Sequence, residues 1–287
     1  MRFVIIASRR TGSSHLVNTL SGHPEIFCHG NIFGSHMMPV FWPRGQRKPR
    51  EIESIKTELR ELRDADPEGF LDRVYTLGHG KPHVGFKIFR GQNNRILETL
   101  IRDSSVRKLV LYRGNVLASY SSDLAAKSTG SWGAQEGHEK PRAPKVKFSE
   151  DEFVAYYNEN ARWYSRIIGD LLSHREAFHL IRYEEINDPL FLRTIVNFIG
   201  ADPNRPIEES EQPKRQIKQN SFDIVSRFSD EDGVRQFLSR HSLLSWAHEG
   251  EASVTARWEG LADDEPAGGA LNGSGVPVSE NRAGNSC

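Results

Sequence analysis

Short apolar runs alternate along this chain with longer segments in which apolar residues recur at helical spacing. An apolar, β-branched run of this length is typical of a strand that is buried on both faces. The predicted strands cover residues 2–7, 26–28, 84–89, 106–112 and 177–183. Strands that alternate with helices predict an α/β fold with a mainly parallel sheet that helices cover on both faces.

Local signals at helix ends support the helical segments. Ser149 with Glu152 fits a capping box, Asp188-Pro189 has the order of a cap and a first helical residue, and Gly200 is a typical end. The predicted helices span residues 13–23, 51–75, 93–103, 115–127, 149–171, 188–200 and 230–246.

Three segments show neither the apolar runs of strands nor the helical spacing of apolar residues. Residues 30–50 and 128–148 are rich in glycine and proline and predict loops. Residues 261–287 contain no aromatic residue and few apolar ones, which predicts a disordered polar tail. The expected organisation is therefore one α/β domain over residues 1–260 followed by this tail.

Charge and cysteine content narrow the function classes. The 38 basic and 38 acidic residues cancel, so the total charge favours neither a nucleic-acid partner nor a membrane surface, and any anion site must be local. The two cysteines, Cys28 and Cys287, exclude a disulfide framework and suit a reducing compartment. There is no apolar run of membrane-spanning length and no signal segment, so we expect a cytoplasmic protein.

The clearest candidate site is the stretch "ASRRTGSSHL" at residues 7–16, between the first strand and the first helix. Such a junction offers backbone N–H groups and the positive end of a helix dipole to an anion. The side chains of Arg10, Thr11, Ser13 and Ser14 add further donors around Gly12. The loop lacks the Gly-Lys of an ATP-binding loop, which speaks against a nucleoside triphosphate.

Two other segments carry basic residues. Arg113 follows the strand at 106–112 and is followed at helical spacing by Ser121 and Ser122, either of which can share an anion with it. Because ligands of parallel sheets bind beyond the carboxyl ends of the strands, Arg113 is expected on the same rim as the first loop. The segment "PKRQIKQN" at residues 213–220 is a local basic cluster.

Together these segments resemble the sulfotransferases that use 3′-phosphoadenosine 5′-phosphosulfate (PAPS). "SRRTGSSHL" is similar to their 5′-phosphosulfate loop, with Arg9 in place of the common proline, and "LVLYRGNVLASYSS" is similar to their 3′-phosphate element. "SGHPEIFCHGNIF", "VGFKIF", "IRYEEI" and "KRQIKQNSFDIVSRF" resemble segments of bacterial carbohydrate-type members such as the Nod-factor sulfotransferases. The likeness covers roughly residues 2–229.

The resemblance implies a P-loop-like three-layer fold around a mainly parallel sheet of about five strands. It implies in-line transfer of a sulfuryl group from PAPS, as co-substrate and without a metal, to a carbohydrate or small-molecule acceptor, leaving 3′,5′-ADP. Residues 9–14 would bind the 5′-phosphosulfate, with Arg10 at the bridging oxygen. Arg113 would bind the 3′-phosphate together with Ser121, or with Ser122. Three basic residues of the 213–220 cluster would close over that end of the nucleotide: Lys214, Arg215 and Lys218. Lys87 is a further candidate for contact with the sulfate or the acceptor.

Asn31 departs from the pattern. In the resembling subgroup a glutamate stands at this position as general base, whereas an asparagine can orient a hydroxyl but cannot take its proton. Three explanations remain open: His29 or His36 is the base, the acceptor is acidic enough to need none, or the protein binds the donor without efficient transfer. The sequence therefore predicts a sulfotransferase, with a non-catalytic PAPS-binding protein as the alternative and an unusual P-loop kinase as a third, weaker one.

Overall fold

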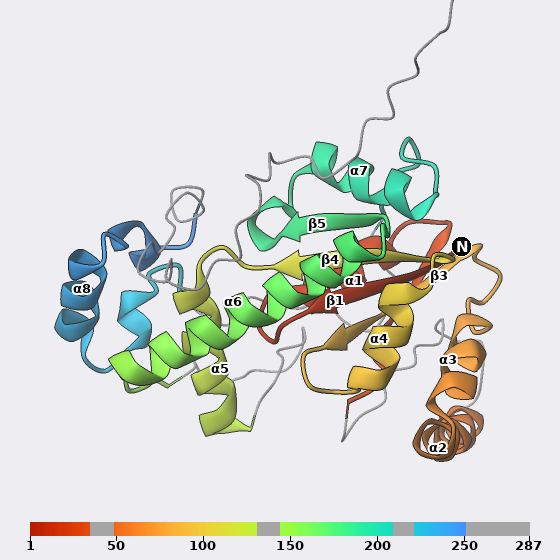
Figure 1. Cartoon of the computed structure of the whole chain (residues 1–287), viewed down its shortest axis with the longest axis horizontal. Helices are drawn as coiled ribbons and strands as arrows, with labels where there is room; N and C mark the ends of the chain where they lie inside the picture. Colours follow the sequence, from red (N-terminus) through yellow and green to blue (C-terminus); the bar gives the residue numbers. More distant parts are fainter. Residues whose placement is uncertain (35–48, 131–143, 209–220, 251–287) are drawn as a thin grey trace, which may run out of the picture.

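Five parallel strands form the centre of the structure, a computed structural model that describes residues 1–34, 49–130, 144–208 and 221–250 (Figure 1). In chain order the strands are β1 (Arg2–Ala7), β2 (Ile26–Asn31), β3 (His83–Phe89), β4 (Val106–Tyr112) and β5 (Phe178–Arg182). They pair in the order β2-β3-β1-β4-β5. The predicted α/β class and the parallel five-stranded sheet are thus confirmed.

The strand order reverses at β1. The chain places β2 and β3 on one side of this strand and β4 and β5 on the other. Ala7, the last residue of β1, pairs with Phe89 on β3 and with Leu111 on β4. The loops that follow these three strands therefore start at one edge of the sheet, where parallel α/β proteins bind ligands.

Helices cover both faces of the sheet (Figure 1). Val4 and Ile6 of β1 pack with residues of α2, α3, α4 and α6, whereas Phe3, Ile5 and Ala7 pack with residues of α1 and α7. This alternation gives the three layers. The helices of the described residues are α1 (Ser13–Ser21), α2 (Pro49–Ala65), α3 (Pro67–Tyr75), α4 (Asn94–Arg102), α5 (Val116–Thr129), α6 (Glu150–Ser173), α7 (Pro189–Ile199) and α8 (Glu231–Arg240), with the 3-10 turns η1 (Tyr183–Glu185), η2 (Val225–Arg227) and η3 (Leu244–Ala247).

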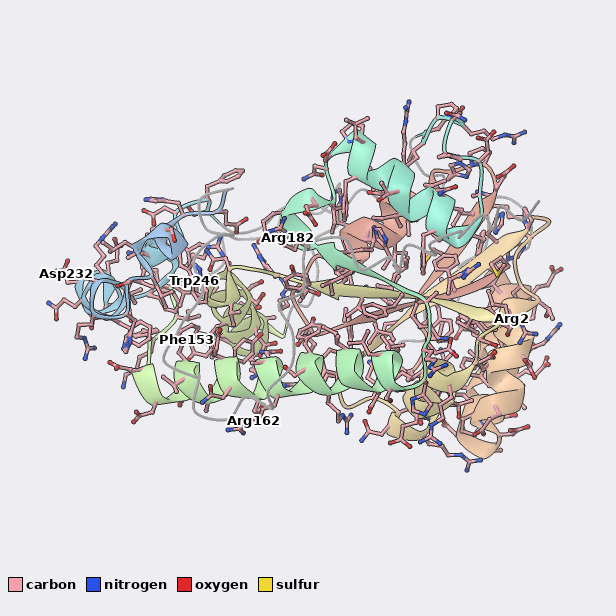
Figure 2. The ribbon with its side chains drawn as sticks, turned by 45° about the horizontal axis from the view of Figure 1, so that its top comes forward. Arg2, Phe153, Arg162, Arg182, Asp232 and Trp246 are labelled. Atoms are coloured by element: carbon pink, nitrogen blue, oxygen red, sulfur yellow. The ribbon has the colours of Figure 1, made fainter. Side chains whose placement is uncertain are left out.

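A separate apolar cluster lies beyond the end of the sheet. It joins α5, the first half of α6, α8, η2 and η3, and it is rich in aromatic rings. Phe153 on α6 and Trp246 on η3 meet edge to face, with ring centroids 6.4 Å apart (Figure 2). This cluster holds the C-terminal part of the described chain against the start of α5.

Two predicted helices have different limits. The span 51–75 is divided into α2 and α3 because Asp66 caps α3 by accepting a hydrogen bond from the Gly69 N–H (3.0 Å) and Pro67 begins the new helix. The span 230–246 ends as an α-helix at Arg240, since Ser242 adopts a φ of 56° that a regular helix does not allow. No helix in the described ranges is long and apolar enough to cross a membrane.

Tyr164 on α6 ties the ends of two central strands together. The backbone N–H of Ser8 donates to the Tyr164 hydroxyl (2.8 Å), and this hydroxyl donates to the Leu111 carbonyl (2.7 Å). Burial raises the pKa of Tyr164, so the hydroxyl keeps the proton that it donates. One phenol thus fixes the starting point of the loop after β1 relative to the end of β4.

We expect Tyr164→Phe to lower the free energy of unfolding by about 1–3 kcal/mol, because the buried Ser8 N–H loses its partner. Urea denaturation followed by circular dichroism measures the change. Tyr75→Phe is the matched control, since the Tyr75 hydroxyl makes a longer bond of 3.4 Å to the Phe3 carbonyl. Equal losses for the two variants would contradict the role given to Tyr164.

Candidate active site

The loop between β1 and α1 has the geometry of an anion site. Thr11 Oγ1 donates to the Ser8 carbonyl (2.8 Å) and so closes the loop internally. Gly12 precedes α1 without a side-chain cap, and the first turn of α1 carries no acidic residue. Backbone N–H groups and the positive end of the α1 dipole are therefore available to an anion.

Gly12 is required by both its conformation and its surroundings. Its φ of 83° lies in the left-handed region, and a Cβ added there would lie 2.2 Å from Cδ2 of Tyr183. Tyr183 belongs to η1, directly after β5. Its ring forms a wall of the loop, a role that the sequence motifs do not assign to it.

Lys87 on β3 supplies the ammonium group that the loop itself lacks. Its Nζ donates to Ser14 Oγ (2.5 Å) and approaches Ser13 Oγ at 3.5 Å. Burial, together with the neighbouring Arg10, lowers the pKa of Lys87 to about 8. An anion at the loop would raise this pKa again, because opposite charge favours the charged form.

Arg10 connects the loop to α5. Its Nε donates to Ser122 Oγ (2.7 Å), and its carbonyl accepts from Arg113 Nη1 (3.2 Å) and from Ser119 Oγ (3.4 Å). Burial lowers the pKa of Arg10, and Asp123 acts in the opposite direction. The adjacent Arg9 is exposed.

Arg113 lies on the same rim as the loop, directly after β4. Its guanidinium lies over the Tyr183 ring, with the central carbon 4.3 Å from the ring centroid, and its Nη2 forms an ion pair with Glu249 (2.8 Å). The structure therefore brings Arg113 beside Arg10 and the first turn of α1, although Arg113 follows Arg10 by 103 residues in the sequence.

The two candidate serines of α5 have different partners. Ser121 Oγ accepts from Nη1 of Arg227 (3.2 Å), whereas Ser122 Oγ accepts from Arg10. Arg227 belongs to η2, outside the predicted basic cluster. Lys214, Arg215 and Lys218 of that cluster lie outside the described residues.

Asn31 and His29 lie near the end of β2 in different environments. Asn31 pairs with Lys87 across the sheet, and its Oδ1 is buried with no hydrogen-bond partner among the described residues. His29 is fully buried, and burial together with His79 lowers its pKa to about 3. A histidine of this pKa is neutral and a weak base at physiological pH, which disfavours the predicted catalytic role of His29. His36 lies outside the described residues.

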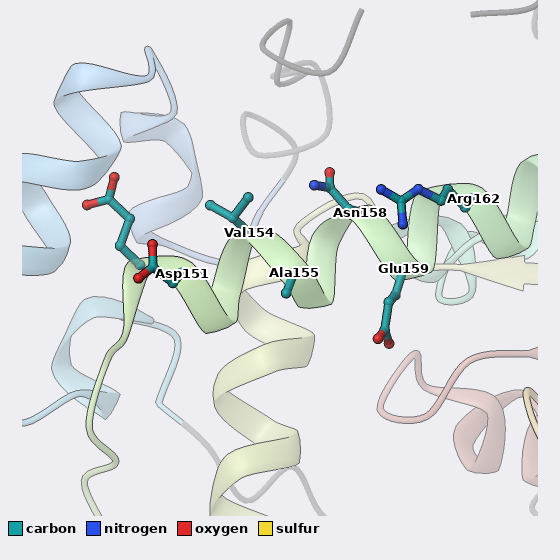
Figure 3. Close-up of a pocket in the computed structure, with 7 residues that line it drawn as sticks. Asp151, Val154, Ala155, Asn158, Glu159 and Arg162 are labelled. Atoms are coloured by element: carbon teal, nitrogen blue, oxygen red, sulfur yellow. The ribbon is translucent and has the colours of Figure 1, made fainter. Parts of the chain in front are cut away.

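A pocket on α6 is separate from these residues. All of its lining side chains come from residues 150–162 of that helix (Figure 3), and none is a predicted site residue: Glu150, Asp151, Val154, Ala155, Asn158, Glu159 and Arg162. Within the described ranges no cluster of histidine, cysteine and carboxylate side chains has the geometry to hold a metal ion.

Sequence reasoning missed three side chains around the predicted ones: Tyr183, Arg227 and Glu249. Tyr183 and Arg227 lie in the segments "IRYEEI" and "KRQIKQNSFDIVSRF", but the resemblance assigned neither of them a role. Glu249 lies outside every quoted segment, and all three side chains reach the rim through the fold. Lys87 did carry a signal, since it is a charged residue within an otherwise apolar strand segment.

Comparison with known proteins gives distant relatives. The chain is 26% identical over 213 residues to "Nodulation protein H" of Rhizobium tropici, which covers 71% of this chain and 77% of the relative. It is 25% identical over 204 residues to "Nodulation protein H" of Rhizobium meliloti, a match that covers 69% of this chain and 77% of that relative. No family model matches. The chain is thus a distant homologue of these nodulation proteins, which confirms the relationship that the motifs predict.

Among solved structures, the fold is similar to a sulfotransferase from Alicyclobacillus acidocaldarius. The TM-score is 0.46 at 17% identity, over 86% of this chain and 98% of that chain.

The lowered pKa of Lys87 predicts a dependence of stability on pH. Because the folded-state pKa of about 8 lies below the ordinary lysine value of 10.5, the unfolded chain binds more protons between these pH values. Stability relative to Lys87→Met should therefore rise with pH above about 8, by up to about 1.4 kcal/mol per pH unit. Urea denaturation from about pH 7 to 9.5 tests this. Lys145→Met, at an exposed position, gives the baseline, and a difference that stays flat or falls would show that Lys87 keeps its proton.

Proposed function

We propose that this protein is a PAPS-dependent sulfotransferase that transfers a sulfuryl group to a hydroxyl of a carbohydrate or small molecule and releases 3′,5′-ADP. The observation that carries the proposal is the pairing of two basic anion sites on one rim of the sheet. One is the β1–α1 loop with Lys87 on its serines, and the other is Arg113, which shares Glu249 with Arg227, the residue that bonds Ser121. A nucleotide with separate 5′ and 3′ anionic groups fits such a pair.

The donor sulfate and 5′-phosphate would lie at the start of α1. Ser13, Ser14 and the backbone N–H groups would donate to their oxygens, and the Lys87 ammonium would lie against them. In the transfer the acceptor oxygen forms a bond to sulfur while the bond from sulfur to the bridging oxygen breaks. Negative charge then develops on the bridging oxygen, and fixed cationic donors near it lower the barrier.

Arg10 is the residue that we assign to the bridging oxygen. It is held from two directions, by its carbonyl bond to Arg113 and by its Nε bond to Ser122. A guanidinium fixed before the reaction needs little reorganisation when charge develops, which favours stabilisation of the transition state over that of the ground state.

The acceptor would enter beside the end of β2. Asn31 Oδ1, which has no partner among the described residues, would accept a hydrogen bond from the acceptor hydroxyl and orient its oxygen toward sulfur. The hydroxyl proton would leave to a base other than His29 or to solvent. An acceptor of lowered pKa fits this site best, because less basicity is then required of the protein.

A second function is favoured by the same asparagine. A protein that binds PAPS or 3′,5′-ADP without transfer would keep both anion sites and need no base at position 31. The two functions share the nucleotide site and differ only in turnover, so one experiment addresses the site and another the transfer.

We expect 3′,5′-ADP, but not ATP, to raise the melting temperature. At a concentration of 100 times its dissociation constant, the ligand adds about 2.7 kcal/mol to the free energy of unfolding. Each kcal/mol raises the melting temperature by roughly 2–4 °C in a domain of this size. Gly12→Ala should abolish the shift, because its Cβ would collide with Tyr183. Stabilisation by ATP alone would instead support a kinase-like protein.

We expect Arg10→Ala to lower kcat at least about 100-fold, while the dissociation constant of 3′,5′-ADP changes about threefold or less. Transfer from labelled PAPS to a panel of sugars, phenols and lipids measures kcat, and calorimetry measures binding. Arg193→Ala, on the exposed side of α7, controls for loss of a surface arginine. Equal losses in kcat and binding would contradict the transition-state role, and binding without transfer to any acceptor would favour the non-catalytic function.

A further inference from the structure

Glu249 places a carboxylate between two buried arginines at the predicted 3′-phosphate position. Its Oε1 lies 2.8 Å from Nη2 of Arg113 and also accepts a hydrogen bond from Nη2 of Arg227. The three side chains are 7–9% exposed. Nη1 of Arg227 reaches Ser121 Oγ, the hydroxyl expected to bind this phosphate.

The charges in this cluster do not balance. One carboxylate faces two guanidinium groups, and burial lowers the pKa of Arg227 although Glu249 acts to raise it. Glu184, another carboxylate on the same rim, accepts from the Gly114 N–H (3.5 Å). A phosphate monoester, with a charge of roughly −1.5 to −2, would match two guanidinium groups better than one carboxylate does.

The backbone that carries Glu249 is fixed independently of these ion pairs. Its N–H donates to the Phe222 carbonyl (2.9 Å). The preceding residues are held by Asn115, whose Nδ2 donates to the carbonyls of Trp246 (3.1 Å) and His248 (3.3 Å). The carboxylate can therefore leave the arginines by rotation of the Glu249 side chain while the segment stays in place.

We propose that Arg227 completes the 3′-phosphate site of Arg113 and Ser121, and that Glu249 fills this site in the ligand-free protein and competes with the phosphate. The inference rests on the proposed function, since it concerns the same nucleotide. A carboxylate and a phosphate cannot share the position between the guanidinium groups, because two anions at contact distance repel each other strongly in a buried site. Binding of the donor therefore requires Glu249 to turn away.

Competition by Glu249 acts only on ligands that carry a 3′-phosphate. A nucleotide such as 5′-AMP would occupy the β1–α1 loop and leave the carboxylate where it is. Removing the charge of Glu249 should thus tighten the binding of 3′,5′-ADP and leave the binding of 5′-AMP nearly unchanged. Removing the Arg227 guanidinium should weaken the binding of 3′,5′-ADP but not that of 5′-AMP.

Calorimetry of the full chain with 3′,5′-ADP and 5′-AMP tests the proposal. We expect Glu249→Gln to lower the dissociation constant of 3′,5′-ADP about tenfold and to change that of 5′-AMP about twofold or less. Arg227→Gln should raise the dissociation constant of 3′,5′-ADP at least about tenfold, with 5′-AMP again little changed. Glu231→Gln is the control, because Glu231, the first residue of α8, pairs at the surface with Lys145 and contacts neither arginine in any ion pair of the described residues.

The outcomes separate this proposal from the proposed function. If the wild type prefers 3′,5′-ADP over 5′-AMP but Glu249→Gln binds it no more tightly, competition by Glu249 is overturned while the proposed function stands. If the wild type binds neither nucleotide, the proposed function fails and the 3′-phosphate site with it. If Glu249→Gln does not fold, Arg227→Gln decides, and an unchanged preference for 3′,5′-ADP in that variant overturns the proposal.

Discussion

The parallel pairing of β1 with β3 and β4 is the constraint on which the candidate site depends. Ile5 lies opposite Lys87 on one side, and Ala7 lies opposite Leu111 on the other. This register brings the Lys87 ammonium under the first turn of α1 and places Arg113 beside the same loop. A slip of one residue in either pairing would turn these side chains to the opposite face of the sheet and dissolve the site.

Gathering cations on one rim has an electrostatic cost that the protein meets by local compensation. Arg10 lies near Asp123, Arg113 stacks on the ring of Tyr183, and Arg113 and Arg227 share Glu249. Among the described residues, Lys87 has serine hydroxyls rather than a carboxylate as its partners, and burial lowers its pKa. The cations of the candidate site are thus held in place before any ligand binds. Their burial disfavours the charged forms of Arg10, Lys87 and Arg227.

The strands and the basic loop were predictable because their signals are local. Buried parallel strands read as apolar runs, and "RRTGSS" follows the first of them directly. The division between α2 and α3 also had a local signal in Asp66-Pro67, but the apolar periodicity on both sides obscured it. By contrast, the contacts of Lys87 depend on strand register, and those of Arg227 and Glu249 depend on the return of a late segment to α5. The environment of His29, which disfavours it as a base, is likewise set by the packing of β2 rather than by its neighbours in sequence.

Asn115 links two parts of the chain that are far apart in sequence. Its Oδ1 caps α5 by accepting from the Ala118 N–H (3.1 Å), and its Nδ2 donates to the carbonyls of Trp246 and His248. Both ends of one amide are therefore in use, which fixes its orientation. The first turn of α5 and the segment after α8 consequently gain their stability together, so loss of the late segment would fray the start of the helix that carries Ser121. Asn115 and the aromatic cluster therefore couple the folding of this end of the molecule, and Arg113 and Arg227 gain their shared carboxylate only when the chain has been made to about Glu249.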